Sequence, residues 1–132
     1  MKTILVDAVY TFIKETPEGF KINEPMQKML DGLPNNKIIL TNASYDKYEK
    51  YGLHNMPYEV FSLSHNPEKT DPQYFKIMLE HFNLNVDDVV YFEHNIDAVK
   101  SAESVGIKTF NWDKENGQLL DLENFLTTNL ML

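Results

Sequence analysis

The sequence predicts an α/β protein of three layers, in which a five-stranded parallel sheet carries helices on both of its faces. Short apolar runs rich in β-branched residues alternate along the chain with segments whose apolar residues recur at helical spacing. Continuous apolar runs are typical of strands that are buried on both faces of a sheet. Strands and helices that alternate in this way require parallel strands joined by right-handed crossovers, which place helices on both faces.

The first third of the chain is predicted to contain a strand, a hairpin and a helix. Residues 3–6 are a continuous apolar run and form the first strand. The segments 12–15 and 20–22 flank the tetrad Thr-Pro-Glu-Gly at 16–19, whose proline and glycine favour a turn, so a small hairpin is expected. Within 24–33 four apolar residues share one helical face, and a proline stands in the first turn, where a helix tolerates it.

Strands and helices alternate over the remaining residues. Four further strands are predicted, at residues 37–40, 58–63, 89–92 and 108–111. Four further helices are predicted, at residues 45–51, 72–82, 96–105 and 118–126. Asp71 is expected to cap the second of these helices, while Gly52 and Gly106 are expected to end the first and the third.

The composition favours an acidic protein with one domain. The chain has 132 residues, and its hydrophobic share of 42% is enough for a core without disulfides. The absence of cysteine excludes a thiolate nucleophile and a cysteine-ligated metal, and it agrees with a cytoplasmic protein. The net charge of −8 argues against nucleic-acid binding, which depends on clustered Lys and Arg. No membrane helix is expected, because no apolar stretch approaches the roughly 18 to 20 residues that one needs.

Polar residues follow the ends of the predicted strands. Asp7 follows the first strand, Thr41 the second, Ser64 the third, and residues 93–95 the fourth. The carboxyl ends of parallel strands meet at one edge of the sheet, where such folds bind their ligands. We therefore expect these residues to form the functional site.

Four segments in chain order carry the motifs of a known family. They read Ile-Leu-Val-Asp-Ala-Val-Tyr-Thr at 4–11, Ile-Ile-Leu-Thr-Asn at 38–42, Glu-Lys-Thr-Asp-Pro at 68–72 and Phe-Glu-His-Asn-Ile-Asp-Ala at 92–98. The set resembles the four motifs of the haloacid dehalogenase-like (HAD) hydrolase superfamily and spans nearly the whole chain. The resemblance implies a Rossmann-like HAD fold with strand order 5-4-1-2-3, counted along the chain. A single core domain over 1–132 without a cap domain is expected, because the elements predicted between the motifs leave no room for one.

The resemblance implies a role for each matching residue. Asp7 holds the position of the nucleophile, a carboxylate that attacks phosphorus and splits one difficult step into two. Thr11, Thr41, Asn42 and Lys69 fall where the family binds phosphate. Lys69 would also neutralise the charge of the nucleophile and of the phosphoryl group.

Three positions depart from the family pattern and weaken the expected Mg²⁺ site. Val9 stands where the family has its acid and base, and His94 and Ala98 occupy positions of metal-binding carboxylates. Mg²⁺ prefers oxygen ligands, so an imidazole is a poor substitute. Asp7 and Glu93 remain as carboxylates for a metal, and a mixed site with His94 would suit Mn²⁺ or Zn²⁺ better. His94 is a candidate for the acid and base that Val9 cannot provide.

Two functions remain open on the sequence. The first is a phosphatase or phosphotransferase with altered metal dependence, in which Asp7, Thr41, Lys69, Glu93 and His94 are catalytic. The second is a catalytically degenerate HAD-fold protein that binds a phosphorylated ligand or a protein partner, because fold inheritance is not activity. An open site can accept a large substrate or be covered by another subunit, so a homo-oligomer is one candidate arrangement.

Overall fold

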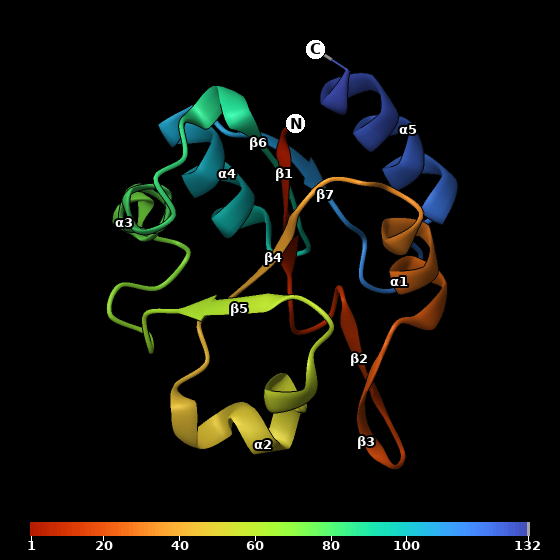
Figure 1. Ribbon diagram of the computed structural model, residues 1–132. Helices are drawn as coiled ribbons and strands as arrows, with labels where there is room; N and C mark the ends of the chain where they lie inside the picture. Colours follow the sequence, from red (N-terminus) through yellow and green to blue (C-terminus); the bar gives the residue numbers. More distant parts are fainter. Residues whose placement is uncertain (132) are drawn as a thin grey trace.

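A five-stranded parallel sheet forms the centre of the protein, for which a computed structural model describes residues 1–131 (Figure 1). The strands in chain order are β1 (Thr3–Asp7), β4 (Lys37–Thr41), β5 (Glu59–Ser62), β6 (Val89–Glu93) and β7 (Lys108–Asn111). They lie side by side in the order β5-β4-β1-β6-β7, and every neighbouring pair is parallel. The strand order expected from the family resemblance is confirmed.

Helices cover both faces of the sheet, as predicted. The main helices are α1 (Glu24–Asp31), α3 (Pro72–His81), α4 (Ile96–Val105) and α5 (Leu119–Leu130). Helices α3 and α4 lie on one face, and α1 and α5 lie on the other (Figure 1). Along β1 the side chains alternate between the faces: Ile4 and Val6 pack with α1 and α5, whereas Leu5 packs with α3 and α4. None of the helices in residues 1–131 has the length and apolarity that crossing a bilayer requires.

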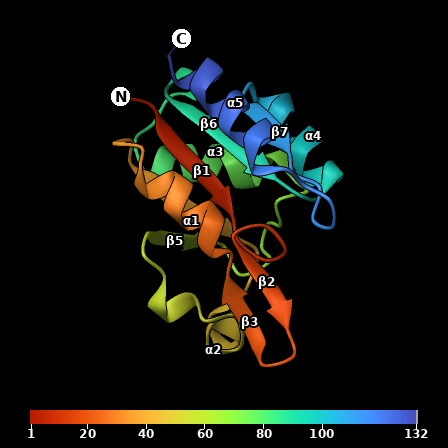
Figure 2. The same cartoon turned by 90° about the vertical axis from the view of Figure 1, so that its right-hand side faces the viewer.

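The predicted hairpin is present and extends beyond the carboxyl end of β1 (Figure 2). Its strands are β2 (Ile13–Thr16) and β3 (Gly19–Ile22), which pair antiparallel. Gly19 has a φ of 109°, a conformation that glycine adopts without the strain of a side chain. The hairpin packs on the segment after β4, since the rings of Phe20 and Tyr51 lie 4.9 Å apart. It therefore forms one wall of the sheet edge at which Asp7 lies.

The boundaries of some elements differ from the sequence predictions. The helix predicted at 45–51 is a 3₁₀ turn, η1 (Tyr45–Lys47), followed by a single α-helical turn, α2 (Tyr48–Tyr51). Two further 3₁₀ turns of three residues each, η2 (Leu53–Asn55) and η3 (Val86–Asp88), precede β5 and β6. The last helix, predicted to end near residue 126, continues to Leu130 and includes two threonines near its end. The predicted cap is confirmed: the Asp71 side chain accepts a hydrogen bond of 2.9 Å from the Gln73 N–H.

Candidate active site

The polar residues expected at one edge of the sheet do meet there. Asp7, Thr41 and Glu93 are the last residues of three adjacent strands, β1, β4 and β6. All three are buried, with exposed fractions of 1%, 3% and 0%. Lys69 reaches the same point from the loop before α3 and is 5% exposed. Four ionisable or hydroxyl side chains are thus held together at the carboxyl edge with little access to water.

Both oxygens of the Asp7 carboxylate are hydrogen-bonded. Oδ1 accepts a bond of 2.5 Å from the Lys69 Nζ. Oδ2 accepts a bond of 2.6 Å from the Thr11 hydroxyl and one of 3.2 Å from the His94 backbone N–H. The His94 Nδ1 also lies 2.5 Å from Oδ2. With its proton on Nδ1, His94 donates to the carboxylate and covers it from the solvent side, because its own side chain is 21% exposed.

Glu93 is held as firmly as Asp7. Its Oε1 accepts a bond of 2.7 Å from the Lys69 Nζ and a further bond from the Tyr91 hydroxyl. Its Oε2 accepts a bond of 3.0 Å from the Asn95 N–H and lies 3.2 Å from the His94 Nδ1. Lys69 and His94 therefore each lie between two buried carboxylates.

The charged side chains of the site shift one another's pKa values. Burial alone would raise the pKa of Asp7, but the Lys69 ammonium and the His94 hydrogen bond lower it well below its usual range. Burial alone would lower the pKa of His94, but the bonds to Asp7 and Glu93 raise it to about 9. The two carboxylates attract the Lys69 ammonium and raise its pKa above the ordinary value despite burial. Near neutral pH the Asp7 carboxylate therefore faces the Lys69 ammonium and a protonated His94 ring.

Thr41 and Asn42 lie at the site without contacting the Asp7 carboxylate in the part of the chain that the structure describes. The Thr41 hydroxyl oxygen accepts a bond of 3.1 Å from the Ala43 N–H. The Asn42 Oδ1 accepts a bond of 2.7 Å from the backbone N–H of Lys69. Asn42 thus fixes the main chain from which Lys69 reaches the carboxylates. Ser64 is exposed in the loop after β5, where its N–H donates to Ser62, so it lies outside this network.

Solved structures with the same fold include HAD hydrolases. A HAD-family enzyme variant from Bacteroides thetaiotaomicron, in complex with magnesium and inorganic phosphate, is 12% identical, with a TM-score of 0.64 over 88% of this chain and 96% of that chain. A subfamily IA HAD hydrolase from Geobacter sulfurreducens is 12% identical, with a TM-score of 0.68 over 93% of this chain and 96% of that one. This chain has the HAD hydrolase fold.

A third HAD-superfamily hydrolase, from Ehrlichia chaffeensis, is 16% identical, with a TM-score of 0.67 over 89% of this chain and 63% of that chain. Neither the models of protein families nor the curated protein sequences give a match. At identities of 12–16% the likeness to these structures shows the fold alone.

The residues of this HAD-fold site do not fit Mg²⁺. The ligand atoms of Asp7, Glu93 and His94 do gather within 4.8 Å of one another. However, the Lys69 ammonium already lies within hydrogen-bond distance of both carboxylates. On the other side, the 2.5 Å separation of the His94 Nδ1 from the Asp7 Oδ2 is that of a direct hydrogen bond, with which an ion would have to compete. The third group is an imidazole, which Mg²⁺ disfavours.

Two tyrosines contribute to the HAD-fold site that the sequence patterns did not nominate. Tyr91 is fully buried in β6 and its hydroxyl holds Glu93. Its place two residues before Glu93, on the same face of a strand, was a usable signal. Tyr10 lies beyond β1 with a φ of 69°, and its ring meets the His94 ring edge-on at 5.7 Å. A left-handed backbone at an aromatic residue cannot be read from the sequence pattern.

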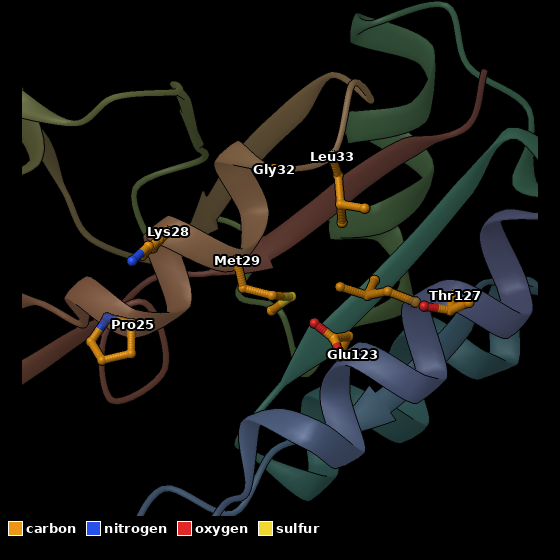
Figure 3. A pocket seen from close by; sticks show the side chains of 8 residues that line it. Pro25, Lys28, Met29, Gly32, Leu33, Glu123 and Thr127 are labelled. Carbon is orange, nitrogen blue, oxygen red and sulfur yellow. The ribbon is translucent and has the colours of Figure 1, made fainter.

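Two hollows of similar size differ in their relation to the site. One of about 450 Å³ lies between α1 and α5 and is lined mainly by apolar groups such as Met29 and Leu33 (Figure 3). None of the catalytic candidates lines it. The other, of about 490 Å³, begins at His94 and Asn95 and is bounded by the segment that follows β7. Of these two, only the second is lined by a residue, His94, that contacts the buried carboxylates.

Proposed function

We propose that this protein is a HAD-type phosphoric ester hydrolase or phosphotransferase in which Asp7 is the nucleophile. One observation carries the proposal: the Asp7 carboxylate lies at the carboxyl edge, 2.5 Å from the Lys69 Nζ on one oxygen and 2.5 Å from the His94 Nδ1 on the other. The Lys69 ammonium and the His94 hydrogen bond also keep the pKa of Asp7 well below its usual range. A carboxylate activated as a nucleophile needs the ionised form and nearby positive charge for the phosphoryl group. The substrate would be a small phosphorylated molecule of the cytoplasm.

In the first step an oxygen of Asp7 attacks phosphorus and the bond from phosphorus to the ester oxygen breaks. The His94 imidazolium gives its proton to the departing oxygen, which leaves as an alcohol. Lys69 offsets the charge on the phosphoryl group, and the Thr41 hydroxyl donates to a phosphoryl oxygen. Thr41 is suited to this because its oxygen accepts from Ala43 while its proton donates to no other group in residues 1–131.

In the second step water attacks the phosphorus of the aspartyl-phosphate. Neutral His94 takes a proton from the water, the bond between phosphorus and Asp7 breaks, and inorganic phosphate leaves. His94 thus fills the role that Val9 cannot. In the free protein the His94 ring lies on the Asp7 carboxylate. The ring must therefore turn away from the Asp7 Oδ2 before the phosphorus of a substrate can approach in the first step.

We propose further that catalysis runs with little or no dependence on a divalent cation. Lys69 and His94 bring two positive charges to Asp7 and Glu93. Glu93 then acts as the counter-ion that orients Lys69 and His94, since all its acceptor positions toward the site are in use. A metal would have to displace the proton shared between His94 and Asp7.

A panel of phosphate esters tests the proposal, with the native protein compared with Asp7→Asn. Each ester is assayed with EDTA and with added Mg²⁺, Mn²⁺ or Zn²⁺. We expect turnover in EDTA and a loss of about 10³-fold or more in Asp7→Asn, because catalytic residues act as a unit. Turnover that survives the substitution overturns the nucleophile assignment. Turnover only with an added metal overturns the cation-independent scheme and leaves Asp7 in place.

A protein that binds a phosphorylated ligand or a protein partner without turnover is the second candidate. It is favoured by the burial of Asp7, which is 1% exposed and bonded at both oxygens, as in a purely structural ion-pair network. The same panel distinguishes the two functions. Measurable binding of phosphate or of an ester, with no turnover under any metal condition, supports the binding protein.

A further inference from the structure

The hollow beside His94 extends along a loop that no motif of the sequence explained. Its far wall consists of residues 112–115, between β7 and α5. Two smaller hollows, of about 240 and 190 Å³, are lined in part by the same Lys114 and Glu115, and they add Tyr10 and Lys14. The three hollows share Lys114 and Glu115, and together they are here named the hollow. A concave surface of this kind beside a reactive group suits a small molecule.

Tyr10 links the catalytic group to the far wall of the hollow. Its ring lies edge-on to His94 at 5.7 Å, and the Lys114 Nζ lies 4.9 Å from the centre of the same ring. The ring attracts the ammonium through its negative face and so holds Lys114 over the hollow. Tyr10 has a φ of 69°, and strained backbone of this kind persists where the surroundings fix it, commonly at functional sites.

The lysines of the hollow are free to bind an anion. Neither Lys14 nor Lys114 forms an ion pair within residues 1–131. Asp113, the residue before Lys114, already accepts hydrogen bonds from the backbone N–H groups of Glu115 and Asn116.

Two glutamates lie with the lysines, Glu115 in all three hollows and Glu15 in the one of about 240 Å³, so charge alone does not choose the ligand. The contacts do. Lys114 is held by Tyr10, whereas neither glutamate side chain has a hydrogen bond or an ion pair in the part of the chain described. A cationic ligand would also have to compete with Lys114 for the Tyr10 ring. Because Tyr10 already holds the Lys114 ammonium in place, an anionic ligand that binds Lys114 costs less side-chain freedom than a cationic ligand that must order Glu15 or Glu115.

We infer that the hollow is a specificity subsite in which Lys114, with Lys14 beside it, binds a second anionic group of the substrate, a carboxylate or a second phosphate. The inference rests on the proposed phosphate chemistry at Asp7. Its substrate class is a small phosphate ester that carries another negative charge away from the ester that reacts. Tyr10 serves as the positioning residue that keeps Lys114 over the hollow.

Matched esters test the subsite by binding, apart from turnover. The dissociation constants of 3-phosphoglycerate and glycerol 3-phosphate, which differ in one carboxylate, are measured by calorimetry on Asp7→Asn. A second pair, fructose 1,6-bisphosphate and fructose 6-phosphate, replaces the carboxylate by a phosphate. We expect the more charged member of at least one pair to bind about fivefold more tightly, and the pair that shows the difference identifies the anion.

Three variants in the same Asp7→Asn background complete the test. Lys114→Ala removes the difference within the pair, Lys114→Arg keeps most of it, and Tyr10→Leu reduces it by releasing Lys114. Lys100→Ala, on the exposed side of α4, serves as the matched control and keeps the full difference. Equal affinity within both pairs, or no detectable binding of any ester, overturns the subsite. Selective binding of the charged ester without turnover by the native protein upholds the subsite and overturns the proposed hydrolase.

Discussion

At the scale of single residues, one ammonium group joins the two buried carboxylates of the site. The Lys69 Nζ lies 2.5 Å from Asp7 and 2.7 Å from Glu93, in surroundings that exclude water. A buried ion pair adds little net stability when it is complete, but removal of one member leaves an uncompensated charge. Lys69 thus pairs with Asp7, the residue whose charge the motif resemblance expects it to neutralise.

Lys69→Met is expected to destabilise the protein by about 3–5 kcal/mol, because Asp7 and Glu93 lose their shared partner in a buried site. Urea unfolding followed by circular dichroism measures the loss. Adding Glu93→Gln should recover part of it, since one carboxylate then remains for the His94 imidazolium. Lys100→Met, an exposed control, should change the free energy of unfolding by less than about 0.5 kcal/mol. A loss below about 1 kcal/mol in Lys69→Met would contradict the network.

His94 makes stability depend on pH in a definite window. Its pKa rises from 6.5 to about 9 in the folded protein, so folding favours the protonated ring. This contribution is fully present below about pH 6.5 and disappears as the pH rises through 9. We expect the free energy of unfolding to fall by on the order of 2 kcal/mol across this range. His94→Gln should lack the fall; a variant that keeps it would show that another group titrates.

At the scale of elements, the sequence predicted what hydrophobic spacing and turn residues determine. The strands, the hairpin at residues 12–22 and the cap at Asp71 all depend on neighbours in the chain, and each is confirmed. The helix predicted at 45–51 begins with a 3₁₀ turn at 45–47, since a segment of seven residues is short for a stable α-helix.

The parts of the candidate site that could not be predicted depend on distant contacts. The hydrogen bond from His94 to Asp7 joins residues 87 positions apart. The motif pattern placed His94 at the site but could not show that its ring would cover the nucleophile. Likewise, the path from Tyr10 to Lys114 crosses from the segment after β1 to the segment after β7. No local spacing relates those two segments, so only the fold brings them together.

The loop between β7 and α5 gives a prediction at this scale. A Cβ on Gly117 would lie 2.5 Å from the Asp113 carbonyl oxygen and 2.7 Å from the Trp112 ring, too close for either to stay in place. Gly117→Ala should therefore cost about 1–3 kcal/mol and shift the Trp112 fluorescence as the loop moves. Gly32→Ala is the matched control, because the new Cβ would come no nearer than 3.4 Å to its neighbours. An unshifted spectrum in Gly117→Ala would contradict the packing of this loop.

At the scale of the whole molecule, the sheet separates two hydrophobic clusters that share its strands. Met26 and Trp112 belong to the cluster under α1 and α5, and Met78 and Phe75 to the cluster under α3 and α4. The buried strand β1 supplies side chains to both. The site lies at the edge where these layers end, so the positions of Asp7 and Glu93 depend on both clusters at once. Loosening one cluster should therefore be felt in the other.

Met78→Ala tests this coupling. Met78 is fully buried in the cluster under α3, and its truncation should cost about 2–5 kcal/mol through the lost contacts and the cavity that remains. The single tryptophan, Trp112, lies in the opposite cluster and reports on it separately. If the chain unfolds as one unit, the fluorescence of Trp112 and the circular dichroism shift to the same lower urea midpoint. Ile77→Ala, at a residue 39% exposed on the same helix, should shift both only slightly. A fluorescence transition that stays in place while the circular dichroism moves would mean that the two faces of the sheet unfold separately.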